Sequence, residues 1–416
     1  MTARIIPSRE ACVARDEADP LFGRRGLFDL PPGVIYLDGN SLGVLPRGVA
    51  ERVGEAMRSE WGKGLISSWN SAGWIDLPAL VGSRIAPMIG AAVDEVIAAD
   101  STSVNLFKLA AGAVRVQRPR RVILTEPRNF PTDLYILQGL SAWLGDDVEL
   151  RVVERTTIAD ALDEDVALLV LTHVHYKTGA VHDMASLTGR AHEVGALALW
   201  DLSHSAGALA VDLNGAGADL AVGCGYKFLN GGPGAPAFLY VARRWQDRIT
   251  TPLSGWMGHA APFDFRDDYQ PAAGMARTLC GTPPVLALSA LDSALSVFEG
   301  VAMADLRIKS MALGDLFLDL VEARLSDAGF KIVCPRDARA RGSQVSLAHP
   351  EGYAIIQALI ERDVVGDFRA PDILRFGLTP LYVGFADIWD AVDRMAAVME
   401  TGFWREPRFQ VRAAVT

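Results

Sequence analysis

The chain has 416 residues, of which 50% are hydrophobic and 22% are charged, and this composition excludes collagen-like, mucin-like and wholly disordered proteins. Its 40 basic and 50 acidic residues give a formal net charge of −10, which argues against a nucleic-acid partner or an anionic membrane surface. Four cysteines without a Cys-x-x-Cys pair and only short apolar runs lead us to expect a soluble cytoplasmic enzyme without disulfides or membrane spans.

The first part of the chain predicts turns, one helix and one loop. Segments 31–33 and 38–43 are rich in Pro, Gly, Asn and Asp, which are typical of turns. A helix is expected over 49–61. The Ser-, Gly- and Trp-rich segment 64–74 predicts a loop.

From about residue 92 onward, short aliphatic runs alternate with helical patterns. Strands are expected at 121–125, 150–153, 167–172, 196–200, 220–223 and 237–241. Helices are expected at 104–117, 132–143 and 184–194. Because several strands are almost continuously aliphatic, we expect them to be buried on both faces of a mainly parallel sheet in an α/β fold.

The pattern changes after Pro284, where a long helix is expected over 285–325. Strands are then expected at 331–333, 343–347 and 373–378, and helices at 353–362 and 386–399. This mixture predicts a smaller α+β domain. We therefore expect an N-terminal arm over 1–60 that packs with the small domain, a large domain over 61–300, and the small domain over 301–416.

Chemically useful side chains follow the predicted strands, where open α/β sheets bind their ligands. Asp201 ends one strand, Lys227 follows the next, Phe130 follows another, and Thr102 and Ser103 precede a helix. Each residue alone could be a cap, a surface charge or a core aromatic residue. Together they are what pyridoxal phosphate requires: a partner for the ring nitrogen, a Schiff-base lysine, a stacking aromatic ring and hydroxyl groups for the phosphate.

The same segments resemble the kynureninase family. The resemblance is carried by 36–43, 129–133, 201–207, 225–234, 253–256, 281–283 and 375–380. It extends over nearly the whole chain, and the run 226–234 is more specific than the Asp-x-x-His at Asp201, which other fold-type I pyridoxal phosphate enzymes share. It implies a homodimer with shared active sites, in which each chain has a mainly parallel seven-stranded sheet and a smaller α+β C-terminal domain.

The resemblance also implies roles for individual residues. Lys227 would form the Schiff base with pyridoxal 5′-phosphate and act as the base at the α-carbon of the substrate. Asp201 would pair with the pyridinium nitrogen, His204 and Tyr226 would help to hold the cofactor, and Tyr226 would donate a proton to the β-carbon. Arg375 would bind the α-carboxylate of the substrate.

The remaining implied contacts surround the cofactor and the substrate. Thr102 and Ser103 would bind the phosphate, and Phe130 would stack on the ring. Further cofactor contacts would come from Pro131, Thr132, Asp133 and Thr172 of the same chain and from Trp256 and Thr282 of the partner subunit. Asn40 and Trp69 are expected at the substrate, where Trp69 would form an aromatic wall.

The implied reaction is the hydrolysis of L-kynurenine to anthranilate and L-alanine in tryptophan catabolism. Whether 3-hydroxykynurenine is preferred, and whether the role is catabolic or in NAD biosynthesis, stays open, although Thr282, where some relatives have Asn, favours kynurenine. The alternatives are another lyase of the same cofactor class, such as a cysteine desulfurase-like enzyme, and a non-catalytic regulator on the same fold.

Two further signals do not add up to a site. The cysteine candidates for desulfurase chemistry are Cys224, Cys280 and Cys334, and none lies in the small-domain loop that such chemistry needs. His173 and His175 alternate at a strand end, with His182 nearby, but they lack a clear carboxylate or cysteine partner for zinc. We therefore expect no metal.

Overall fold

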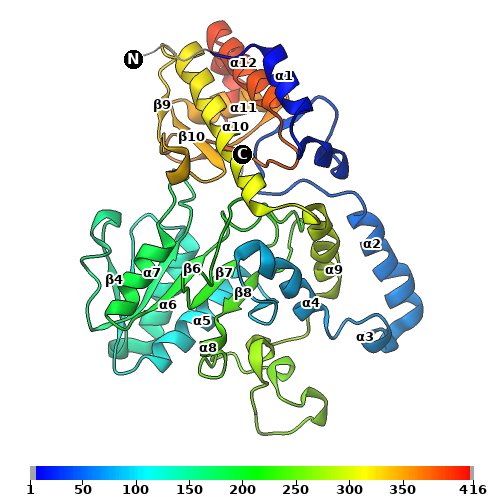
Figure 1. The fold of residues 1–416 in the computed structure, drawn as a ribbon, viewed down its shortest axis with the longest axis vertical. Helices are drawn as coiled ribbons and strands as arrows, with labels where there is room; N and C mark the ends of the chain where they lie inside the picture. Colours follow the sequence, from blue (N-terminus) through cyan, green and yellow to red (C-terminus); the bar gives the residue numbers. More distant parts are fainter. Residues whose placement is uncertain (1–5, 413–416) are drawn as a thin grey trace.

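The computed structural model describes residues 6–412, which form two lobes (Figure 1). The lower lobe surrounds the large sheet, and the upper lobe contains α1 (Arg9–Glu17), α10 (Met303–Arg324), α11 (Gly352–Ile360) and α12 (Phe385–Thr401). A helical arm, formed by α2 (Val49–Glu55) and α3 (Ser68–Ser71), extends to the right of the lower lobe in this view. It is distinct from the N-terminal arm expected over 1–60.

The large sheet has seven strands in the order β2-β8-β7-β6-β5-β3-β4. They are β2 (Val96–Ala98), β3 (Val122–Thr125), β4 (Glu149–Val152), β5 (Val166–Thr172), β6 (Leu197–Asp201), β7 (Leu220–Gly223) and β8 (Phe238–Val241). All neighbours are parallel except that β8 is antiparallel to both β7 and β2. The predicted α/β fold with a mainly parallel seven-stranded sheet is therefore confirmed.

Helices cover this sheet on both faces. They are α4 (Leu77–Ile85), α5 (Thr102–Val116), α6 (Pro131–Leu144), α7 (Met184–Glu193), α8 (Arg243–Gln246) and α9 (Val285–Ala294). Every residue of β5 is buried, and its side chains alternate between two cores. Leu168 and Val170 join the core beneath α5 and α6, whereas Leu169 and Leu171 join the core on the other face. This two-sided burial explains the continuous aliphatic runs of the sequence.

The upper lobe is built on an antiparallel sheet in the order β12-β13-β10-β9. These strands are β9 (Lys331–Ile332), β10 (Gln344–Ala348), β12 (Asp367–Arg369) and β13 (Ile373–Gly377). The start of the chain joins this lobe, because β1 (Ile35–Tyr36) pairs with β11 (Val364–Val365). In addition, Asp16 of α1 accepts hydrogen bonds from the backbone N–H groups of Phe385 and Ala386 at 2.6 and 2.9 Å, which caps α12.

The expected domain boundaries near residues 60 and 300 stay predictions. Residues 1–5 of the expected arm and 413–416 of the expected small domain lie outside the described residues.

Three local expectations differ from the structure. The helix expected over 285–325 is broken, because α9 ends in a 3-10 turn (Leu295–Phe298), Gly300 has φ +71°, and α10 starts only at Met303. Left-handed backbone at Gly300 interrupts a hydrophobic pattern that looks continuous in sequence. The loop expected over 64–74 instead contains a 3-10 turn and α3, and the helix expected over 49–61 becomes a π-helix (Ala56–Gly64) after α2.

Within residues 6–412, no single helix has the length and apolar composition needed to cross a membrane. Only the segments Val285–Phe298 and Met303–Arg324 meet that criterion when they are taken together, and they are bent by 80° at the break between them.

The amino-terminal edge of the sheet contains a buried carboxylate that ties several elements together. Asp219, just before β7, accepts hydrogen bonds from the Ala198 backbone N–H at 2.8 Å, Trp245 Nε1 at 2.7 Å and Arg244 Nη2 at 2.7 Å, and its Oδ2 lies 2.8 Å from His192 Nε2. Burial would raise the pKa of Asp219, but the hydrogen bonds from these partners hold it below its usual value. The ionised carboxylate therefore stabilises the fold.

We expect Asp219→Asn to lower the free energy of unfolding by about 2–4 kcal/mol, because an amide satisfies fewer of these donors and removes a buried charge from its partners. Chemical denaturation measures this change. Asp247→Asn is the matched control, since the Asp247 side chain is exposed and its ion pair with Arg277 is long, at 3.5 Å. It should change the stability by less than about 0.5 kcal/mol. Equal stabilities of the two variants would contradict the role of Asp219.

Candidate active site

Four of the predicted site residues meet at the carboxyl ends of neighbouring strands. Lys227 follows β7, Asp201 ends β6, Thr172 ends β5, and Phe130 follows β3. Because β7, β6, β5 and β3 are consecutive in the sheet, these side chains converge at one edge. The structure therefore brings together the residues that sequence reasoning placed at separate strand ends.

Lys227 is buried beside a histidine and an aromatic ring. Its Nζ is 2.9 Å from His204 Nε2 and 5.6 Å from the centre of the Phe130 ring. Burial, followed by the charge of Lys227, holds the pKa of His204 well below its usual value. The neutral imidazole can accept a hydrogen bond from the lysine amine, which orients the amine in the pocket.

Asp201 and Asp133 form a buried pair of carboxyl groups. Asp201 Oδ1 accepts hydrogen bonds from the backbone N–H of Ser203 at 2.7 Å and from its hydroxyl at 2.6 Å, and Thr172 Oγ1 donates to Asp133 Oδ2 at 3.0 Å. Burial raises the pKa of both carboxyl groups, and the neighbouring Asp201 charge raises that of Asp133 further. The pair thus shares a proton, with Asp133 the neutral member.

The loop before α6 supplies the other residues around this pair. Pro131 and Thr132 are half-buried in the first turn of α6, as is typical of proline at a helix start. Asn129 was not among the predicted site residues, although its Oδ1 contacts the Thr172 hydroxyl. The signal that could have identified it is its position at the start of the 129–133 segment.

The N-terminus of α5 lies at the same edge of the sheet. Its cap is Ser101, whose hydroxyl accepts from the backbone N–H of Val104 at 3.3 Å, so Thr102 and Ser103 belong to the first turn rather than to the segment before it. Both are half-buried. The unpaired N–H groups of a helix start and two hydroxyl groups can bind a phosphate.

Segment 38–43 covers the backbone of the lysine loop. The Gly43 N–H donates to the Tyr226 carbonyl at 2.8 Å, and a Cβ at Gly43 would lie 2.3 Å from the Lys227 carbonyl oxygen, so only glycine fits there. Asn40 is fully buried, and neither polar atom of its amide has a hydrogen-bond partner within the described residues. Burial raises the pKa of the half-buried Tyr226, which keeps its hydroxyl protonated.

Arg375 on β13 is buried and reaches both lobes. It forms a salt bridge with Asp367, its Nη1 donates to the Tyr176 carbonyl at 2.7 Å, and its Nη2 donates to Ser41 Oγ at 3.0 Å. Sequence reasoning missed Asp367, Ser41 and Tyr176. The alternation of Asp367 and Arg369 could have indicated β12, but three residues are too few for a reliable period.

Three predicted residues are not joined to this pocket within residues 6–412, where no contact links Trp69, Trp256 or Thr282 to Lys227, Asp201 or His204. Trp69 lies on α3, away from the sheet, with its ring edge-on to Trp74 at 6.0 Å (Figure 1). Trp256 and Thr282 are exposed. Their roles stay predictions.

Two of the three candidate cysteines are poorly placed to act as nucleophiles, whereas Cys280 is half-buried. Cys224 and Cys334 are buried, and burial raises the pKa of both thiols. Cys224 Sγ donates to the Ser203 carbonyl at 3.7 Å. Protonated, buried thiols react slowly, so the desulfurase-like alternative is not favoured.

The three histidines that suggested zinc each have another partner. His173 Nδ1 is 2.9 Å from Ser205 Oγ, His175 Nε2 is 2.9 Å from the Arg128 carbonyl, and His182 Nε2 is 2.8 Å from Glu126 Oε1. In the part of the chain that the structure describes, no group of three or more His, Cys, Asp or Glu side chains is placed to hold a metal ion.

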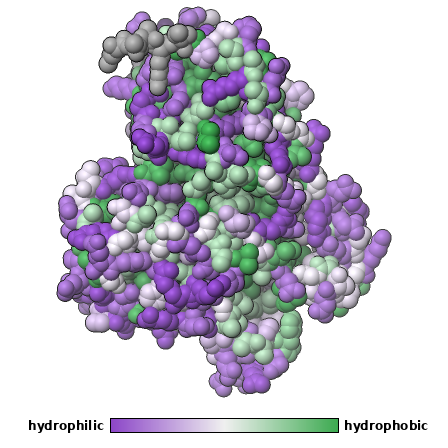
Figure 2. Space-filling view, in the orientation of Figure 1, coloured by the Kyte–Doolittle hydropathy of each residue, from purple (hydrophilic) through white to green (hydrophobic). Residues whose placement is uncertain are grey.

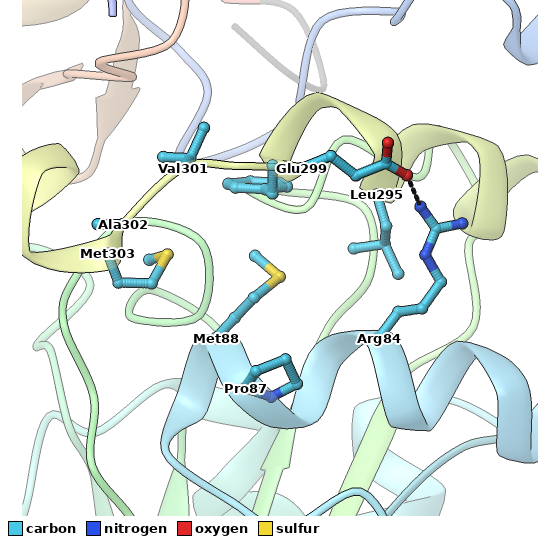
Figure 3. A pocket seen from close by; sticks show the side chains of 9 residues that line it. Arg84, Pro87, Met88, Leu295, Glu299, Val301, Ala302 and Met303 are labelled. Atoms are coloured by element: carbon cyan, nitrogen blue, oxygen red, sulfur yellow. Dashed lines mark hydrogen bonds and ion pairs between the residues drawn. The ribbon is translucent and has the colours of Figure 1, made fainter.

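A cavity of about 440 Å³ lies away from Lys227, between α4 and the break before α10 (Figure 3). Its lining is mainly apolar and includes Met88, Leu295 and Met303. Its two charged residues neutralise each other, since Arg84 Nη2 and Glu299 Oε1 are 2.9 Å apart. We assign no chemistry to this cavity.

Comparisons with known proteins find close relatives over the whole chain. Residues 306–395 match the family model described as the kynureninase C-terminal domain. Proteins named kynureninase from Burkholderia mallei and Pseudomonas fluorescens are 53% and 51% identical to the chain over 416 residues, which cover 99% of this chain and 100% of each relative.

Solved structures with a similar fold are more distant in sequence. A cysteine desulfurase from Thermococcus onnurineus NA1 has a TM-score of 0.74 at 18% identity, covering 96% of this chain and 100% of that chain. A mutant of C-DES with glycine covalently linked to its PLP cofactor has a TM-score of 0.77 at 18% identity, covering 89% of this chain and 98% of that chain. At this identity the likeness establishes the fold alone, which is that of fold-type I pyridoxal phosphate enzymes.

Proposed function

The chain belongs to the kynureninase family, and on that premise we propose that it binds pyridoxal phosphate and hydrolyses L-kynurenine to anthranilate and L-alanine in the cytoplasm, as a step of tryptophan catabolism. The observation that carries the proposal is that Lys227, Asp201 and Phe130 lie together at one edge of the large sheet. 3-Hydroxykynurenine is proposed as a second substrate of the same pocket.

The residues of the pocket fit the cofactor. A lysine amine, a buried carboxyl group, an aromatic ring and a helix N-terminus with two hydroxyl groups match its aldehyde, ring nitrogen, ring face and phosphate. We assign these contacts to Lys227, Asp201, Phe130, and the pair Thr102 and Ser103. When bound, the cofactor supplies an aldehyde that condenses with amines and a ring that takes up negative charge.

The side chains of the chain then move protons and hold the substrate. Lys227 Nζ removes the proton from the α-carbon, and Asp201 holds the proton on the ring nitrogen. Water adds to the γ-carbonyl, the bond between the β- and γ-carbons breaks, and anthranilate leaves. The Tyr226 hydroxyl, which its raised pKa keeps protonated, gives a proton to the β-carbon. Lys227 Nζ returns the proton to the α-carbon, which completes L-alanine.

The proposal is tested by the release of anthranilate. The purified protein, loaded with pyridoxal phosphate, is mixed with L-kynurenine or 3-hydroxykynurenine, and the product is measured by fluorescence. We expect turnover of L-kynurenine. Cofactor binding without turnover of either substrate would overturn the proposal and favour the non-catalytic regulator.

Arg375→Lys is expected to raise the KM for L-kynurenine by about 10- to 100-fold with a smaller change in kcat, because lysine cannot keep the paired contacts to Asp367 and the Tyr176 carbonyl. Steady-state kinetics measure KM and kcat separately. Arg394→Lys is the matched control, since Arg394 is half-buried on α12 and its Nη1 donates to the Arg362 carbonyl at 2.7 Å. An unchanged KM in Arg375→Lys would reject the carboxylate role.

We also propose a homodimer in which Trp256 and Thr282 complete the active site of the partner subunit. Two exposed apolar groups support it: Met57, Trp61, Leu65 and Ile66 near the end of the arm, and Trp256, Phe263 and Phe265 in the extension at the bottom of the molecule. Ile66 and Phe265 are 80% and 78% exposed. Figure 2 shows apolar surface running down the centre of one face toward this extension. Monomeric proteins rarely expose such groups.

Complementation tests the shared site. Lys227→Ala and Thr282→Trp should each be inactive alone, and co-expression should restore about a quarter of the wild-type activity, because half of the dimers are hybrids with one intact site. Light scattering should give twice the mass of the chain. If Thr282 acts within its own chain, no hybrid site is intact and no activity returns.

A further inference from the structure

Two arginines and one carboxylate form a charged cluster, the Arg369–Asp367–Arg375 cluster, on one face of the small sheet. Asp367 on β12 lies directly opposite Arg375 on β13, and Arg369 follows two residues later on β12. Because side chains on a strand alternate between faces, all three lie on the same face. Asp367 bridges the arginines: its Oδ2 is 2.7 Å from Arg369 Nη2, and it also pairs with Arg375.

Most of the hydrogen-bonding capacity of Arg375 is already used. Its Nε donates to Asp367 Oδ1 at 2.7 Å, its Nη2 donates to Asp367 Oδ2 and to Ser41 Oγ, and its Nη1 donates to the Tyr176 carbonyl. An arginine has five N–H groups, so one on Nη1 is left. The side chain is only 2% exposed. Arg375 therefore cannot offer two parallel N–H groups to a substrate carboxylate while this network holds.

Arg369 is the accessible member of the cluster. Its side chain is 37% exposed. Its Nη2 contacts Asp367 and Ser41, and its Nη1 donates to the Phe368 carbonyl at 3.1 Å. The N–H on Nε and a second N–H on Nη1 have no partner within the described residues.

The net charge of the cluster favours the binding of one anion. Asp367 stays ionised, since hydrogen bonding and the charge of Arg375, followed by that of Arg369, lower its pKa against the effect of burial. The nearby Asp38 has its pKa raised to about 7, first by burial and then by the Asp367 charge. Below that pH, two guanidinium groups face one carboxylate, and the net single positive charge matches one α-carboxylate.

We propose that Arg369 is a second specificity-determining residue for the α-carboxylate, which it binds together with the remaining N–H of Arg375, while Asp367, Ser41 and the Tyr176 carbonyl hold Arg375 in place. This inference rests on the proposed function. Both arginines then contact the carboxylate. Only the more exposed Arg369 can change its side-chain conformation to fit the substrate.

The test compares Arg369→Gln with the wild type, both loaded with pyridoxal phosphate, at pH 6.5. Isothermal titration calorimetry with L-alanine should show the Kd raised by about tenfold, whereas the Kd of L-alaninamide, in which a neutral amide replaces the carboxylate, should stay within about twofold. The KM for L-kynurenine should rise in parallel, with kcat within about threefold. Arg369→Lys should recover part of the affinity, because it restores the charge.

The matched control is Arg339→Gln, the same change at a side chain that is 88% exposed on another loop of the small lobe, and it should leave both Kd values unchanged. Unchanged binding of L-alanine by Arg369→Gln, or an equal loss for L-alaninamide, would overturn the inference. Failure of the proposed function looks different: the wild type would release no anthranilate, whatever the calorimetry shows.

Discussion

Replacing Lys227 by alanine is expected to lower kcat/KM for L-kynurenine by at least about 10⁴-fold. The change removes both the amine that holds the cofactor and the base that acts at the α-carbon, and a positioned base alone contributes about 10²- to 10⁴-fold. His204, 2.9 Å from the lysine amine, is left without that partner, and its neutral ring cannot form the same bond with the cofactor.

Three measurements check this expectation. Anthranilate release gives the rate, the visible absorbance of the loaded protein reports the covalent attachment, and mass spectrometry after borohydride reduction locates the modified peptide. Lys331→Ala is the control, since Lys331 is exposed on β9, and it should retain the rate, the absorbance and the label on Lys227. A label on another lysine of the wild type would refute the assignment.

Asp201→Asn is expected to lower kcat by about 10³-fold, with a smaller effect on KM. An amide cannot stabilise a proton on the ring nitrogen as a carboxylate does, so the negative charge that develops at the α-carbon is less stabilised. Burial raises the pKa of both Asp201 and Asp133, and the Asp201 charge raises that of Asp133 further, so the substitution removes the carboxylate that is the more readily ionised of the two.

Asp219→Asn is the matched control for this prediction. It makes the same chemical change in a buried carboxylate of the same sheet, but at the amino-terminal end of β7 instead of the carboxyl end of β6. We expect it to lower stability and to leave kcat within about twofold, whereas Asp201→Asn should lower kcat in protein that is still folded at the assay temperature. Equal kcat values for the two variants would contradict the role of Asp201.

Most strands of the central sheet could be predicted from the sequence because they are buried on both faces, although the edge strand β4 is partly exposed. β5, in which all seven residues are buried, appears in the sequence as an uninterrupted aliphatic run. The strands β1, β2, β11 and β12 have two or three residues each, which is too short to show a period. Their existence depends on partners from elsewhere in the chain.

The site residues also divide into those that the local sequence places and those whose contacts depend on distant parts of the chain. Lys227 and Asp201 could be placed at one edge of the sheet from the sequence, because each comes at or after the end of a recognisable strand. The partners of Arg375 could not be identified in this way. Ser41, Tyr176 and Asp367 come from three different parts of the chain, and only the packing of the two lobes brings them together.

The pairing of β1 with β11 has a consequence for synthesis. Ile35 and Tyr36 are synthesised 329 residues before their partners, Val364 and Val365. The large sheet can form while Phe28, which is buried in the finished fold, still lacks its later partner Tyr382. During that interval the segment exposes apolar side chains, so we expect chaperones that bind emerging apolar segments to bind it.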